Sequence, residues 1–266
     1  MPGAGVALRL DDVGAASKRD EVYGLTRVRV GPVAVPFPGN FLFLKYLPPI
    51  KRWGPYRELS ASEWERVLAA LEAARARMTV GVTAGWVESD GSVTPFPRKF
   101  PAAAGVLREG VRCGLLEVAN HGYTHCVLRD GLFRPRLFAG NREFHREFHH
   151  WLPAETHREH LARAQDILQA FFAVPVLTFV PPGNVFSRVT LTAAVETGIR
   201  YVSCLDPGGV GRVDGLTWVA GGDVVAIHDR DLVLGGVDAL RRLLAERPAP
   251  PVTVREVGER LEGGAR

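Results

Sequence analysis

Short apolar runs alternate along the chain with longer segments in which apolar residues recur every three or four positions. The short runs are typical of buried strands, and the longer spacing is typical of amphipathic helices. Ser60–Met78 is the clearest helix, because Ser60 and Glu63 form a capping box ahead of one apolar stripe. The other predicted elements are strands at 6–10, 79–84, 115–119, 176–180, 201–204 and 224–227, and helices at 101–109, 154–172, 187–197, 237–246 and from 253 onward.

Strands and helices follow one another in turn over the whole chain, with no internal repeat. This order favours an α/β fold, with a mostly parallel sheet and helices outside it. A length of 266 residues is ordinary for a single α/β barrel, so we expect one domain over residues 1–266.

Polar residues follow directly on several predicted strands. In a β/α barrel the carboxyl ends of the strands share one face, and that face carries the chemistry. The residues in question are Asp11, Asp12, His121, Asn184, Asp206 and His228.

His121 and His125 lie four residues apart and would fall on the same side of a helical turn, where both rings can reach one cation. Histidines at this spacing are more often surface or packing residues, so the metal-site interpretation depends on a third ligand. Asp11 or Asp12 can supply it, provided that a strand end or turn brings a carboxylate into the pocket. One Asp and two His are a common set for zinc with an open coordination position. The other Asp could then act as general base and His228 as general acid.

Two irregular regions have alternative interpretations. Residues 15–59 contain no clear helix, and their aromatic residues, including Trp53 and Tyr56, suit either a wall against a sugar ring or a packed lid. Residues 142–151 could form an amphipathic helix with His145 and His149 on it. That segment could hold a second metal or contact substrate, but we favour a structural or rim role.

Composition and charge exclude several classes of protein. The net charge of +4 comes from scattered residues, so nothing predicts a nucleic-acid interface. No apolar run is long enough to span a membrane and no secretion signal is evident, so we expect a cytoplasmic protein. The three cysteines show no paired spacing, which argues against a disulfide framework or a zinc ribbon. The oligomeric state is not predicted.

Four segments together resemble the motifs of the polysaccharide deacetylase family, also called the NodB-homology or carbohydrate esterase family 4 domain. Leu10–Gly14 resembles its Asp-Asp-Gly motif, and His121–His125 resembles His-Ser/Thr-x-x-His. Phe179–Gly183 resembles an Arg-x-Pro-Tyr motif, and Gly222–Asp229 resembles a strand that ends in His. The resemblance implies a distorted (β/α) barrel of the NodB-homology type and metal-dependent removal of acetyl from an N-acetylated sugar or related amide.

The resemblance also implies roles for individual residues. Asp11 corresponds to the base that activates a metal-bound water and His228 to the acid, while a backbone N–H near Gly183 would help to hold the oxyanion. The metal would be held by Asp12, His121 and His125; zinc is expected, with cobalt, nickel and manganese as alternatives. The substrate, a glycan or small molecule, would contact Pro182, Gly183, Asn184, Trp53 and Tyr56.

The chain departs from the family pattern at three positions. Gly122 replaces a hydroxyl residue, and Val180 and Gly183 replace the Arg and Tyr of the third motif. Another group, Arg9 or Asn184, would then have to orient Asp11, or else catalysis is weakened. The alternative function is a catalytically silent carbohydrate-binding protein. Retention of both a base and an acid favours a hydrolase, acting on an intracellular sugar such as a nucleotide-linked or lipid-linked one.

Overall fold

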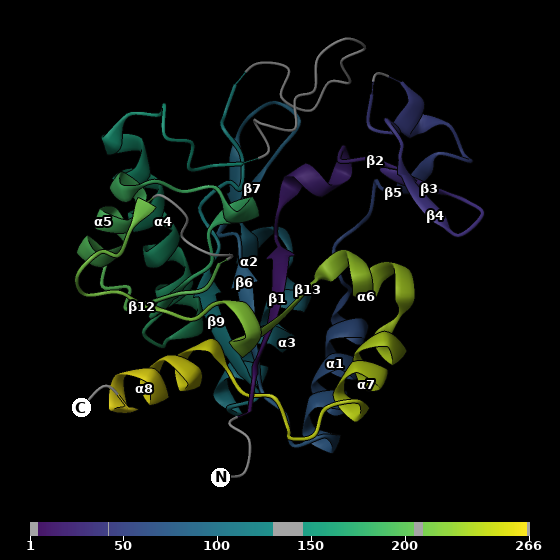
Figure 1. Cartoon of the computed structure of the whole chain (residues 1–266). Coiled ribbons are helices and arrows are strands. Elements are labelled where there is room, and N and C mark those ends of the chain that lie inside the picture. Colours follow the sequence, from purple (N-terminus) through teal and green to yellow (C-terminus); the bar gives the residue numbers. More distant parts are fainter. Residues whose placement is uncertain (1–4, 42, 130–145, 205–209, 265–266) are drawn as a thin grey trace.

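The computed structural model describes residues 5–264 except 42, 130–145 and 205–209. Its centre is a sheet of seven parallel strands in the order β12-β11-β10-β9-β6-β1-β13, curled into a half-barrel with helices outside (Figure 1). The predicted distorted (β/α) barrel is therefore confirmed. The strands are β1 (Ala7–Val13), β6 (Met78–Val82), β9 (Leu116–Asn120), β10 (Thr178–Phe179), β11 (Tyr201–Val202), β12 (Thr217–Trp218) and β13 (Val224–His228).

The helices cover the outside of this sheet and enclose its core. Leu8, Leu10 and Val80 from the strands pack in one buried cluster with Trp64 and Leu71. Burying such side chains is the main source of stability for the half-barrel. The helices are α1 (Ala61–Ala73), α2 (Phe96–Lys99), α3 (Pro101–Arg112), α4 (Ala154–Phe172), α5 (Arg188–Glu196), α6 (Asp229–Gly235), α7 (Val237–Ala245) and α8 (Val254–Gly264). Within the described residues, none of them is long and apolar enough to cross a membrane.

The amphipathic helices were predicted well, because their caps are local in sequence. Helix α1 begins after the predicted capping box, in which Ser60 accepts from the backbone of Glu63 and Glu63 accepts from Ser60. It ends at Ala73, however, five residues before the predicted end, since Arg75 has a positive φ and Met78 already belongs to β6. Helix α4 has the predicted bounds.

The region between β1 and α1 holds more structure than its sequence indicated. Strand β2 (Tyr23–Gly24) pairs with β5 (Lys51–Trp53), and β3 (Arg27–Val30) pairs with β4 (Val33–Pro36) as an antiparallel hairpin. We call residues 23–53 the arm, because in Figure 1 they project away from the barrel beside the carboxyl end of β1. After β6, a small hairpin of β7 (Gly85–Val87) and β8 (Val93–Pro95) leads to α2.

Parallel pairing aligns the ends of the central strands. Asp11 on β1 lies opposite His228 on β13, and Asn120 on β9 lies opposite both Val82 and Phe179. The residues that follow these positions therefore emerge at one edge of the half-barrel. That edge carries the cluster of polar side chains described next.

Candidate metal and active site

The first strand ends in an irregularity that turns two consecutive carboxylates toward one pocket. The pairing of β1 with β6 shifts register between Leu10 and Val13, and Asp12 has a φ of 71°. Neighbouring side chains on a regular strand point to opposite faces, so this bulge is what lets Asp11 and Asp12 line the same cavity. The sequence analysis expected a strand end or turn here, but the sequence pattern did not show at which residue the strand becomes irregular.

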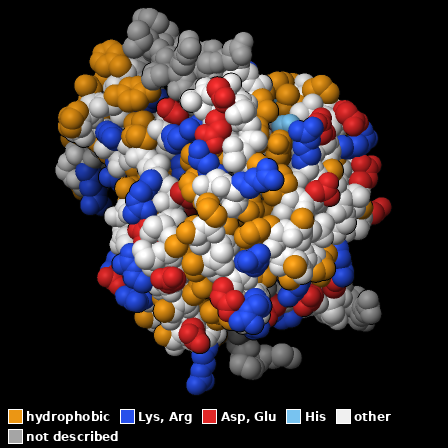
Figure 2. Space-filling view, turned by 180° about the vertical axis from the view of Figure 1, so that it is seen from behind, with side chains coloured by type: hydrophobic (Ala, Val, Ile, Leu, Met, Phe, Trp, Pro, Cys, Tyr) orange, Lys and Arg blue, Asp and Glu red, His pale blue; other side chains and the backbone are white. Residues whose placement is uncertain are grey.

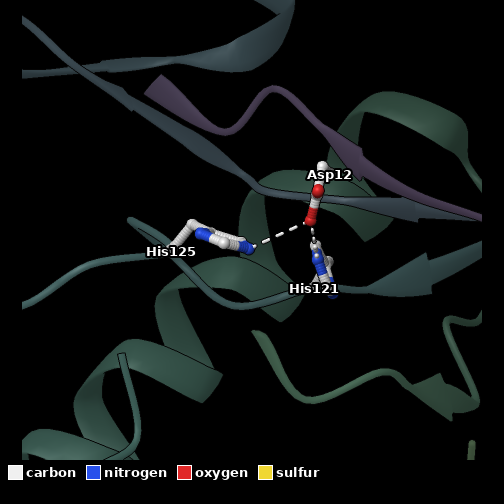
Figure 3. Close-up of side chains that lie close together, drawn as sticks. All are labelled: Asp12, His121 and His125. Carbon is white, nitrogen blue, oxygen red and sulfur yellow. Dashed lines mark hydrogen bonds and ion pairs between the residues drawn. The ribbon is translucent and has the colours of Figure 1, made fainter. Parts of the chain in front are cut away.

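Asp12 lies between the two histidines of the sequence motif (Figure 3). Its Oδ1 atom is 3.3 Å from His121 Nε2 and 3.2 Å from His125 Nε2. One potential ligand atom from each residue lies within 4.8 Å of the others, and within the described part of the chain this is the one group of three such side chains. Ligand atoms about 2.0–2.2 Å from a tetrahedral ion would lie at similar mutual distances.

The surrounding hydrogen bonds leave the ring nitrogens facing Asp12 available to a cation. Nδ1 of His121 lies 2.7 Å from the carbonyl oxygen of Val180, so it donates to that carbonyl and Nε2 keeps its lone pair. Nε2 of His125 is buried, and the group that it faces is Oδ1 of Asp12 at 3.2 Å. Two imidazoles and a carboxylate are ligands that zinc accepts, so the residues present fit a divalent ion.

The protonation states of the cluster suit cation binding. Burial opposes the charge on Asp12, but its contacts with His121 and His125, together with the nearby His228, outweigh burial and hold the pKa of Asp12 well below its ordinary value. Burial also lowers the pKa of His125, against the pull of Asp12. A charged carboxylate next to a neutral imidazole is the state that ligates a metal.

A loop, rather than the predicted helical turn, brings the two histidines together. Residues 121–126 are not helical: 123–126 form bends, and φ is positive at Gly122 (82°) and His125 (59°). The carboxylate of Glu147 lies in the concave side of this loop and accepts from the backbone N–H groups of Tyr123 at 3.0 Å and His125 at 2.9 Å, and from Thr124. The prediction of a shared helical face was therefore wrong, although both rings do converge.

Glu147 also explains the glycine in the histidine motif. A side chain at Gly122 would place its Cβ atom 2.1 Å from Oε2 of Glu147, which is too close for any residue except glycine. His160 donates from Nδ1 to the other oxygen of Glu147 at 2.6 Å. The loop is thus held by a buried carboxylate that comes from a distant segment.

Asp11 is held by a two-point ion pair with Arg9. Nε and Nη2 of Arg9 each lie 2.8 Å from a different oxygen of Asp11, and Nη1 donates to the backbone carbonyl and the hydroxyl of Ser203. Residues two apart on a strand share a face, so Arg9 reaches Asp11 from the same strand. Val180 is buried and apolar. Of the two groups proposed to replace the family Arg, Arg9 makes this contact.

His228 enters the pocket from the end of β13, directly beside β1. Its Nδ1 lies 3.3 Å from Nη2 of Arg230 and 3.8 Å from Oδ2 of Asp231, and its backbone N–H donates to Asp231 at 2.9 Å. Burial lowers the pKa of His228, but Asp231 and the charges of Asp12 and Asp11 together outweigh burial and raise the pKa above its ordinary value.

These groups open into a cavity of about 320 Å³. Of the predicted substrate contacts, Trp53, Gly183 and Asn184 line the cavity, whereas Pro182 and Tyr56 are not among its lining residues. Tyr56 is 7% exposed, and its ring packs edge-on against Trp53 and beneath Lys18. For Tyr56 the packed alternative therefore holds. The cavity is lined by Asp11, Asp12, Glu21, Tyr23, Trp53, His121, Arg146, Pro181, Gly183, Asn184, His228 and Arg230.

Trp53 meets two other side chains of the chain at the cavity wall. Tyr23 stacks on it with ring centroids 4.3 Å apart, and the guanidinium of Arg230 lies 4.4 Å from its ring centroid. Much of the indole surface is therefore already covered. The remaining edge of the Trp53 ring, together with Tyr23 and Arg230, forms the wall of the cavity that faces the arm.

Arg146 lies across the second glycine that departs from the family motif. Gly183 has a φ of 58°, and a Cβ atom there would lie 1.9 Å from Nε of Arg146. Consecutive residues, Arg146 and Glu147, thus fill the space in front of both Gly183 and Gly122. Arg146 also approaches Glu21 across the cavity, at 3.7 Å.

The remaining histidines have structural contacts. His149 stacks on Trp151, and Nδ1 of the buried His157 lies 2.9 Å from the hydroxyl of Thr190. Residues 146–151 are not helical, so the described part of the predicted helix at 142–151 is wrong, and His145 lies outside the described residues, as does Asp206. The structural or rim role is consistent with these contacts.

A buried ion-pair network lies behind the strand ends that carry Asp12 and His228. Lys18 donates to Asp229 and, at 2.6 Å, to Glu58, and Glu58 accepts from the backbone N–H of Gly14. This network ties the turn after Asp12 to the residue after His228. Sequence analysis missed it, and it also missed Glu147, Arg146 and Tyr23, because these contacts join residues far apart in the chain. Arg230 and Asp231 could have been found, since they directly follow the strand-end His228.

Comparison with known proteins identifies the family of this chain. The sequence profile of the polysaccharide deacetylase family matches residues 54–202, which is more than half of the chain. The matched range contains both histidine ligand candidates, and it excludes Asp11, Asp12 and His228. A search of curated protein sequences finds no match.

Two solved structures illustrate the likeness of the fold. A Mycobacterium smegmatis protein assigned to the polysaccharide deacetylases superimposes with a TM-score of 0.52 at 14% identity, covering 100% of this chain and 96% of its own. A carbohydrate esterase family 4 pseudoenzyme from Bacillus anthracis gives 0.50 at 12% identity, over 96% of this chain and 66% of its own length. At such identities the likeness concerns the fold alone. Profile, fold and strand-end cluster agree, and the chain belongs to the polysaccharide deacetylase family.

Proposed function

We propose that this protein is a metal-dependent hydrolase that removes an acetyl or similar acyl group from the nitrogen of a sugar or related amide. The observation that carries the proposal is the placement of Asp11, with its two-point contact to Arg9, in one cavity with Asp12, His121 and His228. A hydrolase of this kind needs a cation site, a base and an acid around one reacting bond.

Asp12, His121 and His125 would hold the ion, with zinc as the first candidate and cobalt, nickel or manganese as alternatives. When bound, such an ion makes a water molecule more acidic and polarises the carbonyl of the scissile amide. The Val180 carbonyl and Ser17, whose Oγ lies 3.5 Å from Nδ1 of His125, would keep both rings oriented toward the ion.

Asp11 would act as general base and take a proton from the attacking water. A base must be held at hydrogen-bond distance from the proton that it removes. Arg9 contributes here by holding both carboxylate oxygens of Asp11, and Ser203 in turn holds Arg9 through its carbonyl at 2.8 Å and its hydroxyl at 2.7 Å. The base is thereby fixed before substrate arrives.

His228 would act as general acid and give its proton to the departing nitrogen. As the C–N bond breaks, the nitrogen needs a proton to leave as an amine. The raised pKa of His228, to which Asp231, Asp12 and Asp11 all contribute against burial, keeps more of the ring protonated near neutral pH. Asp11 and His228 lie opposite each other on paired strands, a placement that suits a base and an acid on two sides of one bond.

The remaining cavity residues support a polar, carbohydrate-like substrate. Asn184 and Arg146 offer hydrogen-bond groups, and the edge of Trp53 offers apolar surface for the carbon skeleton of a sugar. A backbone N–H near Gly183 would help to bind the developing oxyanion.

The alternative is a silent carbohydrate-binding protein that keeps the cavity. The Arg9–Asp11 ion pair argues for the hydrolase, because a binding protein needs no oriented base next to a cation site. The experiment is to measure acetate and free-amine release from a panel of N-acetylated sugars, after chelation and resupply of zinc, cobalt or manganese. Release that depends on the metal supports the hydrolase, whereas sugar binding without release under every metal would favour the silent protein.

A further inference from the structure

The arm carries an unusual combination of charge and exposed apolar surface. Between Glu21 and Glu58 the sequence contains no acidic residue at all. The basic residues in this interval are Arg27, Arg29, Lys45, Lys51, Arg52 and Arg57. The positive charges of the arm therefore have no acidic residue near them in the sequence.

The hairpin β3–β4 is amphipathic, with its apolar face in solvent. Its register pairs Val30 with Val33 and Val28 with Val35. Paired residues and residues two apart share a face, so these four valines form one side of the hairpin. Val30 is 65% and Val33 is 60% exposed. The opposite side carries Arg27, Arg29, Ala34 and Pro36.

The segment that follows the hairpin also exposes apolar side chains. Phe41 is 62% exposed, and Phe43, Tyr46 and Leu47 are exposed as well. In Figure 2, seen from behind, hydrophobic and basic side chains share the upper left of the molecule, where the arm lies in that view. Apolar side chains gathered in this way on a surface mark an interaction site more often than isolated ones do.

The hairpin also has no core of its own. A two-stranded hairpin is marginally stable in water unless one face packs on something. Every residue of β4 is exposed, and in β3 only Val28 is partly buried. The valine face thus lacks the covering that amphipathic hairpins usually have within their own domain.

We propose that the arm docks this protein onto an anionic lipid surface. Exposed aliphatic side chains gain free energy in the acyl region of a bilayer, and flanking Lys and Arg residues gain it near anionic headgroups. Two copies of the arm would repel each other through their positive charge. A nucleic acid would use the arginines but would leave the valine face in water. An anionic lipid surface would both neutralise the positive charge of the arm and remove the valine face from water.

Docking would also place the cavity near the surface. Tyr23 and Trp53 form the base of the arm and line the cavity wall, so the same segment joins the docking face to the site. This inference does not depend on the proposed hydrolase activity, because vesicle binding and amide hydrolysis are measured separately.

The test is sedimentation of the full chain with vesicles of phosphatidylcholine alone or mixed with phosphatidylglycerol. We expect binding to the anionic vesicles that weakens as salt is raised. Arg27→Gln with Arg29→Gln should weaken it roughly fivefold per charge, and Val30→Thr with Val33→Thr should weaken it about tenfold. Threonine keeps the shape and strand preference of valine, so the fold should persist.

The matched control is Leu234→Thr with Val189→Thr. These apolar residues are 61% and 41% exposed and lie outside the arm, on α6 and α5. This control should bind vesicles like the wild type. The proposal is overturned if the wild type ignores anionic vesicles, or if the control and the hairpin variants bind equally. It is also overturned if the valine substitutions convert a dimer to a monomer in sedimentation velocity, since the face would then belong to a second copy.

Discussion

Arg9 donates hydrogen bonds from Nε and Nη2 to the two carboxylate oxygens of Asp11, each at 2.8 Å. The two residues lie two positions apart on the same strand. In the family pattern an arginine from another strand orients the base, and here that position is the buried Val180. In this chain the arginine that contacts Asp11 thus comes from the same strand as Asp11 and not from the third motif.

The first prediction tests that contact through Arg9→Lys. Lysine keeps the charge but cannot hold two oxygens in one plane, so Asp11 loses its fixed orientation. We expect kcat to fall roughly 10–100-fold, as for other residues that orient a catalytic group. Ser203→Ala is the control, since it removes one of several contacts to Arg9 and should cost far less. Equal kcat in Arg9→Lys and wild type would show that Arg9 does not position the base.

The second prediction concerns the cation ligands. His121→Ala and His125→Ala should each lose most of the bound metal, because either change leaves only two protein ligands. Elemental analysis of the dialysed proteins, with zinc supplied beforehand, is the measurement. Metal content that persists in both variants would place the ion elsewhere.

The third prediction concerns Glu147, which touches the histidine loop but none of the ligand atoms of the rings. Glu147→Gln should weaken metal affinity roughly 10–100-fold. A glutamine side chain has one oxygen that can accept from the loop N–H groups, whereas the carboxylate uses two. Glu117→Gln is the matched control: Glu117 is also buried, and it accepts hydrogen bonds from Thr79, Thr178 and the backbone of Arg255.

Titration calorimetry with zinc on both variants makes the distinction. Glu117→Gln should lower thermal stability and leave zinc affinity unchanged. If both variants lose affinity to the same extent, the effect of Glu147 is general destabilisation rather than support of the loop.

The fourth prediction is a pH dependence. As a general acid His228 must be protonated, so activity should fall as pH rises through its pKa, which Asp231, with Asp12 and Asp11, holds above the ordinary value. Asp231→Asn removes the charge but can still accept from the backbone N–H of His228. The alkaline limb of kcat/KM should therefore move to lower pH in Asp231→Asn. An alkaline limb at the same pH in both proteins would remove Asp231 from this role.

The sequence predicted what is local or periodic. Apolar runs located six of the seven central strands, all except the two-residue β12, and a capping box located the start of α1. The polar residues after the strands pointed to the edge of the sheet where the cluster lies. Parallel pairing then brought Asp12 to His121 and His125, as expected of strand ends.

The failures involve backbone turns and distant partners. The loop at 121–126 depends on left-handed residues and on Glu147, so the spacing of its histidines suggested a helix that does not form. The arm was predicted as irregular, because β2 and β5 are short and pair across nearly thirty residues of sequence. Arg146 reaches the cavity from a segment whose pattern suggested a helix.

The most direct test of the central claim compares wild type with Asp11→Asn, both loaded with the same metal, on the N-acetylated sugar that the wild type cleaves best. Asparagine fills the same space as Asp11 but cannot accept a proton as a base. The account predicts that kcat for acetate release falls roughly 10²–10⁴-fold while metal content stays unchanged. Equal kcat in the two metal-loaded proteins would contradict it.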